Sequence, residues 1–367
     1  MAGPQTNRER VLAALACQNA PGDLPFLPWG LDALAAPPHP SYAPLFQILG
    51  EKAAIKRRWV GHHDFFLPAP PVVTDTQKHS RHDGTVVETV HLRGPGGELT
   101  CERRGIPGTT ASEATSRYLK SEADVERYLE WPFVDQPADA EPYFGLDRDA
   151  GSRGVVTHRI PSALGVVGEA FEPEPFALCS VENNELVLTL IEVIAQRVTR
   201  YVRRLLEGGA RPIFIIGGPE FATPPLLSPR RFDDYVVRFD QPLIGLIHSY
   251  GCRVLVHCHG RLNAVLERFV DMGVDGLHPI ETLPMGDVTL TEVKRRVGDR
   301  LCLVGNVQIG DMMSAEPEDI RRQVRAIRAQ VPVGMILTTS ATPYESPMSQ
   351  RLYDNYVAAI EAANEWR

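Results

Sequence analysis

The chain has 367 residues, of which 43% are hydrophobic and 23% charged, a composition typical of a globular protein with a substantial core. Its net charge of −8, with no basic cluster, argues against nucleic acid as a partner. No apolar run reaches the roughly 18 residues of a membrane span, so we expect no membrane association. The first residues lack the apolar stretch of a signal peptide, and the six cysteines are scattered, so we expect a cytoplasmic protein with reduced thiols.

The N-terminal part of the chain predicts one helix and one strand. The helix over residues 7–15 would begin with Asn7 as its N-cap and stop at Pro21-Gly22-Asp23. Residues 24–30, Leu-Pro-Phe-Leu-Pro-Trp-Gly, form a candidate first strand because the run is apolar and ends in glycine.

Two segments are predicted to decorate the domain rather than to form its core. Residues 85–105 alternate around Gly94-Pro95-Gly96-Gly97, which is typical of a β-hairpin, and we expect a hairpin insertion over residues 71–105. Residues 132–153 are rich in Asp, Pro and Gly and predict a surface loop.

From residue 154 onward, strand-like and helix-like runs alternate, which predicts repeated β-α units and a parallel sheet. The strand-like runs are 155–160, 212–217, 253–259, 276–280, 301–307 and 335–339, and the helix-like runs are 182–207, 228–249, 261–272, 289–297, 315–329 and 349–365. With the strand at 24–30 and one more within 55–75, the α/β chain would close into a (β/α)8 TIM barrel, a single domain over residues 1–367. A doubly wound open sheet is the alternative, but no glycine-rich phosphate turn follows the first strand.

The most informative run is 254–260, Val-Leu-Val-His-Cys-His-Gly, in which an apolar strand ends in three potential metal ligands. Side chains alternate along a strand, so His257 and His259 would point the same way and Cys258 the opposite way. Two imidazoles on one face can bind a borderline-soft ion such as zinc. The alternative is a pair of buried imidazoles that hydrogen bond to neighbouring strands.

Other strands also end in polar residues, and in a barrel these ends form the active site. Glu220 and Glu281 would be further metal ligands or acid-base groups, although a carboxylate at such a place could equally cap a helix or loop. We expect His278 to be catalytic. Residues expected to contact the substrate are Trp29, Asp32, His158, Asn306 and Tyr344. Aromatic residues that would suit a planar or apolar substrate, but would equally suit the core, are Trp29, Phe65, Phe66, Phe171, Phe221 and Tyr344.

Several motifs together resemble the uroporphyrinogen decarboxylase superfamily, through their order and spacing rather than through any single motif. One is the opening helix followed by Asp23-Leu24-Pro25, and another is His257-Cys258-His259-Gly260. The others are 227–232, 273–276 and 303–307. The resemblance extends over nearly the whole chain, is strongest over residues 205–365, and implies a (β/α)8 barrel.

The superfamily that the chain resembles has two main branches. Its decarboxylases need no cofactor and hold substrate carboxylates with arginines of an N-terminal Met-Arg-Gln-Ala-Gly-Arg type segment, whereas residues 29–34 here contain no arginine. The zinc methyltransferases of the other branch work with corrinoid proteins and bind zinc through a His-x-Cys pair and a later cysteine. Here His257 matches the first ligand, His259 takes the place of the cysteine, and no cysteine lies near Ser340.

The resemblance therefore implies a zinc-dependent methyltransferase of the corrinoid-dependent branch. A site of two histidines with Glu220 or Glu281 is harder and more electrophilic than a thiolate site, which favours cleavage of a bond to oxygen, as in an O-demethylase. The methyl group would pass from a methoxylated small molecule, for example a methoxylated aromatic, to cobalamin on a separate corrinoid protein, or from that protein to an acceptor. A homodimer is a further expectation.

Two alternatives stay open. One is a metal-assisted or cofactor-free decarboxylase or lyase that acts on a small carboxylic acid. The other is a non-catalytic binding barrel, which the missing cysteines would allow and the clustering of His and Glu at strand ends argues against.

Overall fold

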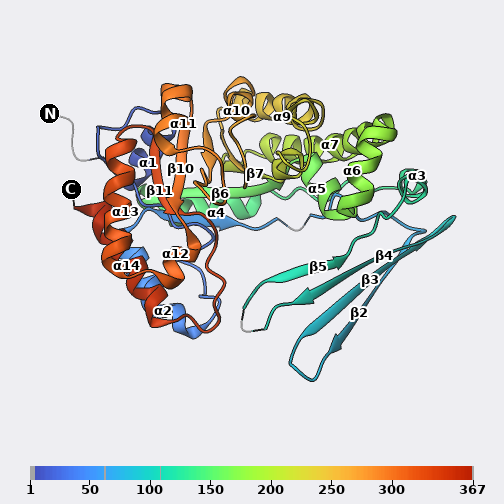
Figure 1. Ribbon diagram of the computed structural model, residues 1–367, viewed down its shortest axis with the longest axis horizontal. Coiled ribbons are helices and arrows are strands. Elements are labelled where there is room, and N and C mark those ends of the chain that lie inside the picture. The colour runs from blue at the N-terminus through green and yellow to red at the C-terminus, as the bar shows by residue number, and fades with distance from the viewer. Residues whose placement is uncertain (1–4, 62, 108, 366–367) are drawn as a thin grey trace.

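Seven parallel strands form one curved sheet in the computed structural model, which describes residues 5–61, 63–107 and 109–365 (Figure 1). Their order in the sheet, β1-β6-β7-β8-β9-β10-β11, is also their order along the chain, so each connection leads to the next strand. The strands are β1 Ile55–Trp59, β6 Gly154–Pro161, β7 Ile213–Gly217, β8 Arg253–His257, β9 Gly276–His278, β10 Cys302–Val307 and β11 Met335–Thr339.

The segment around Phe26 lies between β11 and β1 and closes the sheet. Leu27 N–H donates to Leu337 O (2.9 Å), and Leu337 N–H donates to Pro25 O (2.9 Å). On the other side, Ala54 N–H donates to Phe26 O (2.9 Å) immediately before β1. The prolines on either side of Phe26 have no N–H to donate, which explains why this eighth segment pairs over so short a length. The predicted (β/α)8 barrel is thus confirmed, with strand-like segments in both 24–30 and 55–75.

Helices surround the barrel (Figure 1). In the longest of them, Val187, Ile191 and Ile194 recur at helical spacing and are fully buried against the strands. The helices are α2 Ala43–Lys52, α3 Glu122–Glu130, α4 Glu141–Ala150, α5 Ala163–Ala170, α6 Pro173–Glu182, α7 Asn184–Glu207, α8 Pro229–Phe232, α9 Arg238–Ser249, α10 Leu266–Asp271, α11 Leu290–Val297, α12 Ile309–Ser314, α13 Pro317–Gln330 and α14 Gln350–Asn364. Across the described part of the chain, no helix is long and apolar enough to span a bilayer.

A second sheet projects from the barrel next to α3 (Figure 1). It is antiparallel, in the order β2-β3-β4-β5. The expected hairpin over 71–105 supplies its central pair, and the structure adds one strand on each side of that pair. The strands are β2 Val73–Ser80, β3 Val86–Gly94, β4 Gly97–Gly105 and β5 Ser112–Ser116.

Two local predictions were wrong. Residues 132–153 are not simply a surface loop, because they contain α4, which buries Tyr143 and Ala150 and carries its proline in the first turn, where proline is tolerated. The N-cap of α1 (Asn7–Leu15) is Thr6 rather than Asn7. Thr6 Oγ1 accepts from Glu9 N–H (3.2 Å) while a Glu9 carboxylate oxygen accepts from Thr6 N–H (2.8 Å), a capping box that satisfies two backbone donors.

The interior of the barrel contains a small apolar core of its own. Alternate residues of the strands, such as Val155, Ile215 and Val304, form one buried cluster. Helix α1 closes this cluster at the N-terminal end of the strands through residues such as Leu15, and Trp29 belongs to the same cluster. The filled interior means that a ligand can enter only from the C-terminal ends of the strands.

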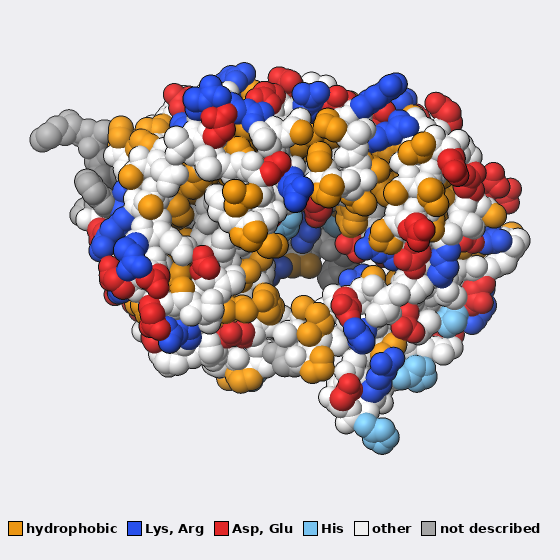
Figure 2. All heavy atoms as spheres, viewed as in Figure 1, with side chains coloured by type: hydrophobic (Ala, Val, Ile, Leu, Met, Phe, Trp, Pro, Cys, Tyr) orange, Lys and Arg blue, Asp and Glu red, His pale blue; other side chains and the backbone are white. Residues whose placement is uncertain are grey.

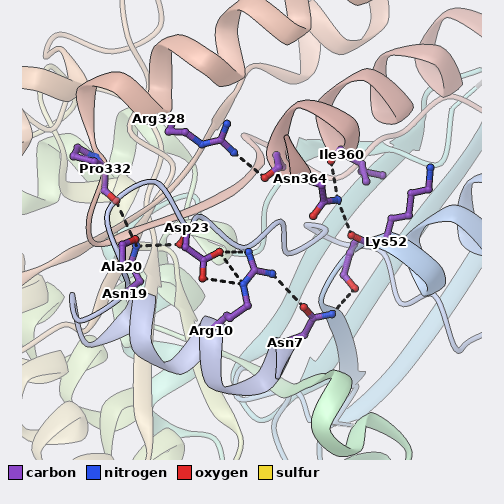
Figure 3. A network of polar contacts seen from close by, with 12 residues as sticks. Asn7, Arg10, Asn19, Ala20, Asp23, Lys52, Arg328, Pro332, Ile360 and Asn364 are labelled. Atoms are coloured by element: carbon purple, nitrogen blue, oxygen red, sulfur yellow. Dashed lines mark hydrogen bonds and ion pairs between the residues drawn. The ribbon is translucent and has the colours of Figure 1, made fainter. Parts of the chain in front are cut away.

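Polar contacts fasten the N-terminal helix to the rest of the chain (Figure 3). Arg10 Nε donates to Asp23 Oδ1 (2.9 Å), and Asn7 Nδ2 donates to Ala53 O (3.3 Å) just ahead of β1. Asn19 Nδ2 donates to Pro332 O (3.4 Å) in the loop before β11. These bonds stabilise the closed end of the barrel, opposite the end where the site lies.

Asp240 on helix α9 has a buried carboxyl group, which lies next to Ser162 at the end of β6. It is 2% exposed, Ser162 Oγ donates to its Oδ1 (3.0 Å), and its Oδ2 has no hydrogen-bond partner. Burial raises the pKa of Asp240 to about 7. The native state therefore binds a proton that the unfolded chain releases at lower pH.

We predict that Asp240→Asn stabilises the protein in a pH-dependent way. Because the native pKa lies above the unfolded one, the wild type loses stability as the pH rises towards about 7, by up to about 1.4 kcal/mol per pH unit, and the variant does not. Urea unfolding at several pH values measures the difference, with the exposed Asp271→Asn as control. An equal pH dependence in wild type and Asp240→Asn would contradict a buried, protonated Asp240.

Candidate active site

The side chains at the C-terminal ends of the strands follow the alternation of the barrel interior. Along β6, Val155 belongs to the interior core, and Thr157 and Arg159 continue the same face into a cavity. Along β8, Leu255 is in the interior core and His257 continues its face. The interior thus changes from apolar to polar along β6 and β8.

A cavity of about 660 Å³ opens at the ends of β1, β6 and β7. Figure 2 shows the molecule hollowed at the centre of this view, with histidine and basic side chains deep in the hollow. The antiparallel sheet contributes Val90, Cys101 and Arg103 to its wall. The aromatic residues that line it are Trp29, Trp59, Phe65, Phe66, Tyr118 and Phe221. Of the aromatics expected at the substrate, Trp29, Phe65, Phe66 and Phe221 are therefore in place, whereas Phe171 is buried in the core.

His257 and His278 form a hydrogen-bonded pair of buried imidazoles. Their Nδ1 atoms are 2.8 Å apart, and His278 Nε2 lies 2.9 Å from the carbonyl oxygen of Thr339. Burial lowers the pKa of His257 to about 2 and that of His278 well below its ordinary value, so both rings are neutral. A carbonyl only accepts, so His278 donates from Nε2 and accepts at Nδ1. His257 must then donate from Nδ1, which leaves the lone pair of its Nε2 free.

His259 is held beside this pair by Glu281. The rings of His257 and His259 have centroids 4.6 Å apart, His259 Nδ1 lies 3.0 Å from Glu281 Oε1, and Gly260 N–H donates to Oε2 (2.8 Å). Burial alone would raise the pKa of Glu281, but these hydrogen bonds hold it below its ordinary value. The carboxylate therefore accepts from His259 Nδ1, and a neutral His259 keeps the lone pair of its Nε2.

Trp29 links the histidines to the cavity. Its indole stacks on His278, with centroids 3.5 Å apart and planes 12° apart. Lys56 Nζ lies 3.8 Å from the centroid of the same indole. Because one face is filled by the imidazole, the ammonium group lies on the other face, which is the face towards the cavity that Lys56 also lines.

Glu220 follows β7 and also lines the cavity. Gly218, in a left-handed conformation (φ 114°), turns the chain so that its own N–H donates to Glu220 Oε2 (3.1 Å). Burial raises the pKa of Glu220, although the nearby His259 lowers it in part. Glu220 is thus a partly buried carboxyl group that is close to His259 and faces the cavity.

Asn306 and Thr338 are paired across β10 and β11 and have unsatisfied polar atoms. Both continue the face of interior-core residues, Val304 and Ile336, so both point into the barrel. Asn306 Oδ1 and Thr338 Oγ1 are buried without a hydrogen-bond partner. Such atoms cost free energy unless a ligand or water meets them, which fits the expectation that Asn306 contacts a bound molecule.

The two imidazoles fit a zinc ion, because zinc-bound histidines usually have the second ring nitrogen fixed by an acceptor, as in His257 and His259. A third protein donor does not join them: within the described ranges, no three His, Cys, Asp or Glu side chains are grouped to hold a metal. Cys258 is fully buried on the other side of the strand, and burial raises the pKa of its thiol well above the ordinary value.

The part of the chain that contains the histidines of the site is similar to known proteins. Residues 168–341 match the family model "Uroporphyrinogen decarboxylase (URO-D)". A methylcobamide:CoM methyltransferase, MtaA, from Methanosarcina barkeri is 29% identical over 132 residues, 36% of each chain. A uroporphyrinogen decarboxylase from Alcanivorax borkumensis is 28% identical over 235 residues, 58% of this chain and 60% of that protein. The chain thus matches only a third to three fifths of the length of these curated relatives.

A methyltransferase from Methanosarcina mazei has the same fold, with a TM-score of 0.65 over 99% of both chains at 16% sequence identity. The segment that matches the family model contains Glu220, both members of the His257–His259 pair, His278, Glu281 and Asn306. Other site residues, such as Trp29 and Lys56, come from the chain before it.

Three residues expected at the substrate lie elsewhere. Asp32 is buried, and its carboxylate accepts from Arg57 Nη1 (3.0 Å) and Arg58 N–H (3.0 Å), so it anchors β1. Tyr344 is outside the cavity lining, and its carbonyl oxygen accepts from Thr110 N–H (3.1 Å), in the segment between β4 and β5. The physical reason is that both residues stabilise chain segments around the mouth of the barrel.

His158 is the third of these residues, and it faces away from the cavity. Its Nδ1 donates to Trp59 O (3.0 Å), and its Nε2 is 3.1 Å from the hydroxyl of Tyr201 on α7. Burial lowers its pKa to about 4. The alternation along β6 explains this placement, because the next residue, Arg159, takes the inward position.

Sequence reasoning missed the basic side chains of the cavity, namely Lys56, Arg58 and Arg159 of the barrel and Arg103 of the antiparallel sheet. Lys56 and Arg58 lie on β1. The sequence predicts this strand only somewhere within residues 55–75, so it does not tell which of its side chains point into the barrel. Arg159 could have been predicted to face the cavity. It lies four residues after the apolar Val155 on the same strand, so both side chains point to the same face.

We predict that His158→Ala lowers the free energy of unfolding by about 1–3 kcal/mol, because the Trp59 carbonyl and the Tyr201 hydroxyl lose their partner. Urea unfolding measures this change. Binding in the cavity is expected to be unchanged, since the ring faces α7. If the variant is as stable as the wild type but binds ligand less tightly, His158 contacts the ligand and the structural role given to it is wrong.

Proposed function

We propose that this chain is a methyltransferase that takes the methyl group from the oxygen of a methoxylated small molecule and passes it to the corrinoid of a separate protein. The observation that carries the proposal is the pair of imidazoles, His257 and His259, each with Nδ1 engaged and Nε2 free, beside an aromatic cavity. The partial similarity to MtaA and the fold shared with a methyltransferase support it. The opposite direction, from the corrinoid protein to an acceptor, would use the same groups.

The residues of the cavity supply what cleavage of a methyl–oxygen bond needs. The oxygen departs with the electron pair of the C–O bond and must gain a proton or lie next to a positive charge. Glu220 fits the role of proton donor because burial raises its pKa and its carboxyl group faces the cavity. The aromatic walls would hold a planar ring and exclude water from it.

We further propose that His257 and His259 hold a zinc ion, which would act as a Lewis acid on the departing oxygen. Within the described residues Glu220 is not grouped with the two imidazoles, so its proposed role is that of proton donor rather than third ligand. Glu281 is better suited to orient His259, because both of its oxygens are already hydrogen bonded. His278 fixes the tautomer of His257 and is a positioning residue.

A second candidate is a carboxy-lyase that acts on a small carboxylic acid, with or without a metal. The basic side chains of the cavity favour it, because they would attract a carboxylate. Release of carbon dioxide from a benzoate without any corrinoid would support this candidate and contradict methyl transfer as the activity.

The zinc proposal predicts about one equivalent of zinc per chain in protein purified without chelator. His257→Ala and His259→Ala are expected to lower the zinc content at least tenfold, because each removes a ligand. Elemental analysis by mass spectrometry measures this, and His79→Ala, which removes an exposed histidine of β2, is the control. Less than about a tenth of an equivalent in the wild type, after incubation with zinc, would contradict the proposal.

Methyl transfer predicts catechol and methylcobalamin as products of 2-methoxyphenol and chemically reduced cobalamin. Glu220→Gln is expected to lower kcat about 10²-fold, because the variant cannot donate a proton. Liquid chromatography of both products measures the rate, and the exposed Glu174→Gln is the control. Wild-type protein that forms neither product from any of a panel of methoxylated compounds would rule the activity out.

A further inference from the structure

Three basic side chains from neighbouring strands of the barrel meet in the cavity, which Arg103 and the carboxyl groups of Asp64, Glu169 and Glu220 also line. They are Lys56 and Arg58 of β1 and Arg159 of β6, and all three line the cavity. Within the part of the chain that the structure describes, none of the three makes an ion pair. Arg58 Nη1 donates to Gly30 O (2.7 Å), and Lys56 lies over Trp29.

Their closeness follows from the register of the sheet. Arg58 pairs with Thr157 and Lys56 with Val155, and these are the inward positions of β6 below Arg159. Burial and the charges of Arg58 and Arg159 lower the pKa of Lys56 to about 7. Cations assembled in this way repel one another. An anion bound among them would offset the unfavourable free energy of this repulsion.

Gly217 makes room for this arrangement. A Cβ at position 217 would lie 2.9 Å from Arg159 Nη2, so any larger residue would displace the guanidinium group. The guanidinium is therefore packed against backbone and faces the cavity, and a planar fork in this setting suits a carboxylate.

We propose that Lys56, Arg58 and Arg159 bind the carboxylate of the substrate, so that the substrates are aromatic carboxylates. That these also carry a methoxy group rests on the function proposed above. The aromatic walls would contact the ring, and the cations lie before residues 168–341, outside the URO-D match. The chain thus supplies from β1 and β6 the positive charge that its segment 29–34 lacks.

The orientation of such a substrate follows from Trp29. The indole has Lys56 on one face and His278 on the other, so the basic cluster and the imidazoles are on opposite sides of one ring. Glu220 and His259 lie at the ends of the next strands, β7 and β8. A carboxylate bound by the cations would therefore lie on the side of the Trp29 indole that Lys56 occupies.

The test compares an acid with its neutral amide, 4-methoxybenzoate and 4-methoxybenzamide, by calorimetry on the full chain. The wild type is expected to bind the acid at least about tenfold more tightly than the amide, as charge-assisted hydrogen bonds require. Arg159→Gln and Arg58→Gln are expected to weaken acid binding about tenfold or more and to leave amide binding nearly unchanged. Arg159→Lys should retain part of the preference, and Arg153→Gln, an exposed arginine outside the cavity, should retain all of it.

Gly217→Ala is a second variant that keeps every charge. It should weaken acid binding by displacing the Arg159 guanidinium, while thermal unfolding confirms that the barrel is folded. A wild type that fails to bind the acid, or binds acid and amide equally, would overturn the proposal. So would an Arg159→Gln variant that weakens both ligands alike.

The outcomes for this site and for the function are distinct. Acid-selective binding without methyl transfer would keep the anion site and reject the methyltransferase. Methyl transfer from neutral methoxy compounds, with no preference for acids, would keep the methyltransferase and reject the anion site.

Discussion

The stack of Trp29 on His278 is the contact on which the site depends. Trp29 belongs to the apolar cluster inside the barrel, so its position is fixed by the same packing that closes the fold. The indole fixes the plane of His278, which accepts a hydrogen bond from His257 Nδ1 and so determines which nitrogen of His257 is free. Lys56 rests on the opposite face. One aromatic ring thus connects the core, the imidazoles and the basic cluster.

The segment that delivers Trp29 also closes the barrel. It lies between β11 and β1 and is bonded to both, although the prolines within it restrict its pairing. The position of Trp29 therefore depends on the pairing of this segment with both β11 and the chain just before β1. The contacts of α1 with the loops at the opposite end of the barrel support that closure.

The sequence predicted the barrel because apolar periodicity and glycine turns report local geometry well. It also brought together the histidine pair and Glu281, because the ends of neighbouring parallel strands must meet at one edge. The sequence did not predict which side chains point into the cavity where this depends on the exact limits of a strand. His158 and Arg159 are adjacent, and only the parity with Val155 tells which of them enters the cavity. Lys56 and Arg58 could not be assigned at all, since the limits of β1 were unknown. The roles of the residues brought together remain proposals.

Burial, with a smaller effect from the charges in the barrel, keeps the imidazoles of His257 and His278 unprotonated and available as lone-pair donors. Burial is the main reason that the pKa of His257 falls to about 2, and His259, Arg159 and Lys56 lower it further. The basic cluster on one side of Trp29 thus opposes protonation of His257 on the other side. It therefore adds to burial in keeping the ring of His257 neutral, so that its Nε2 lone pair stays free.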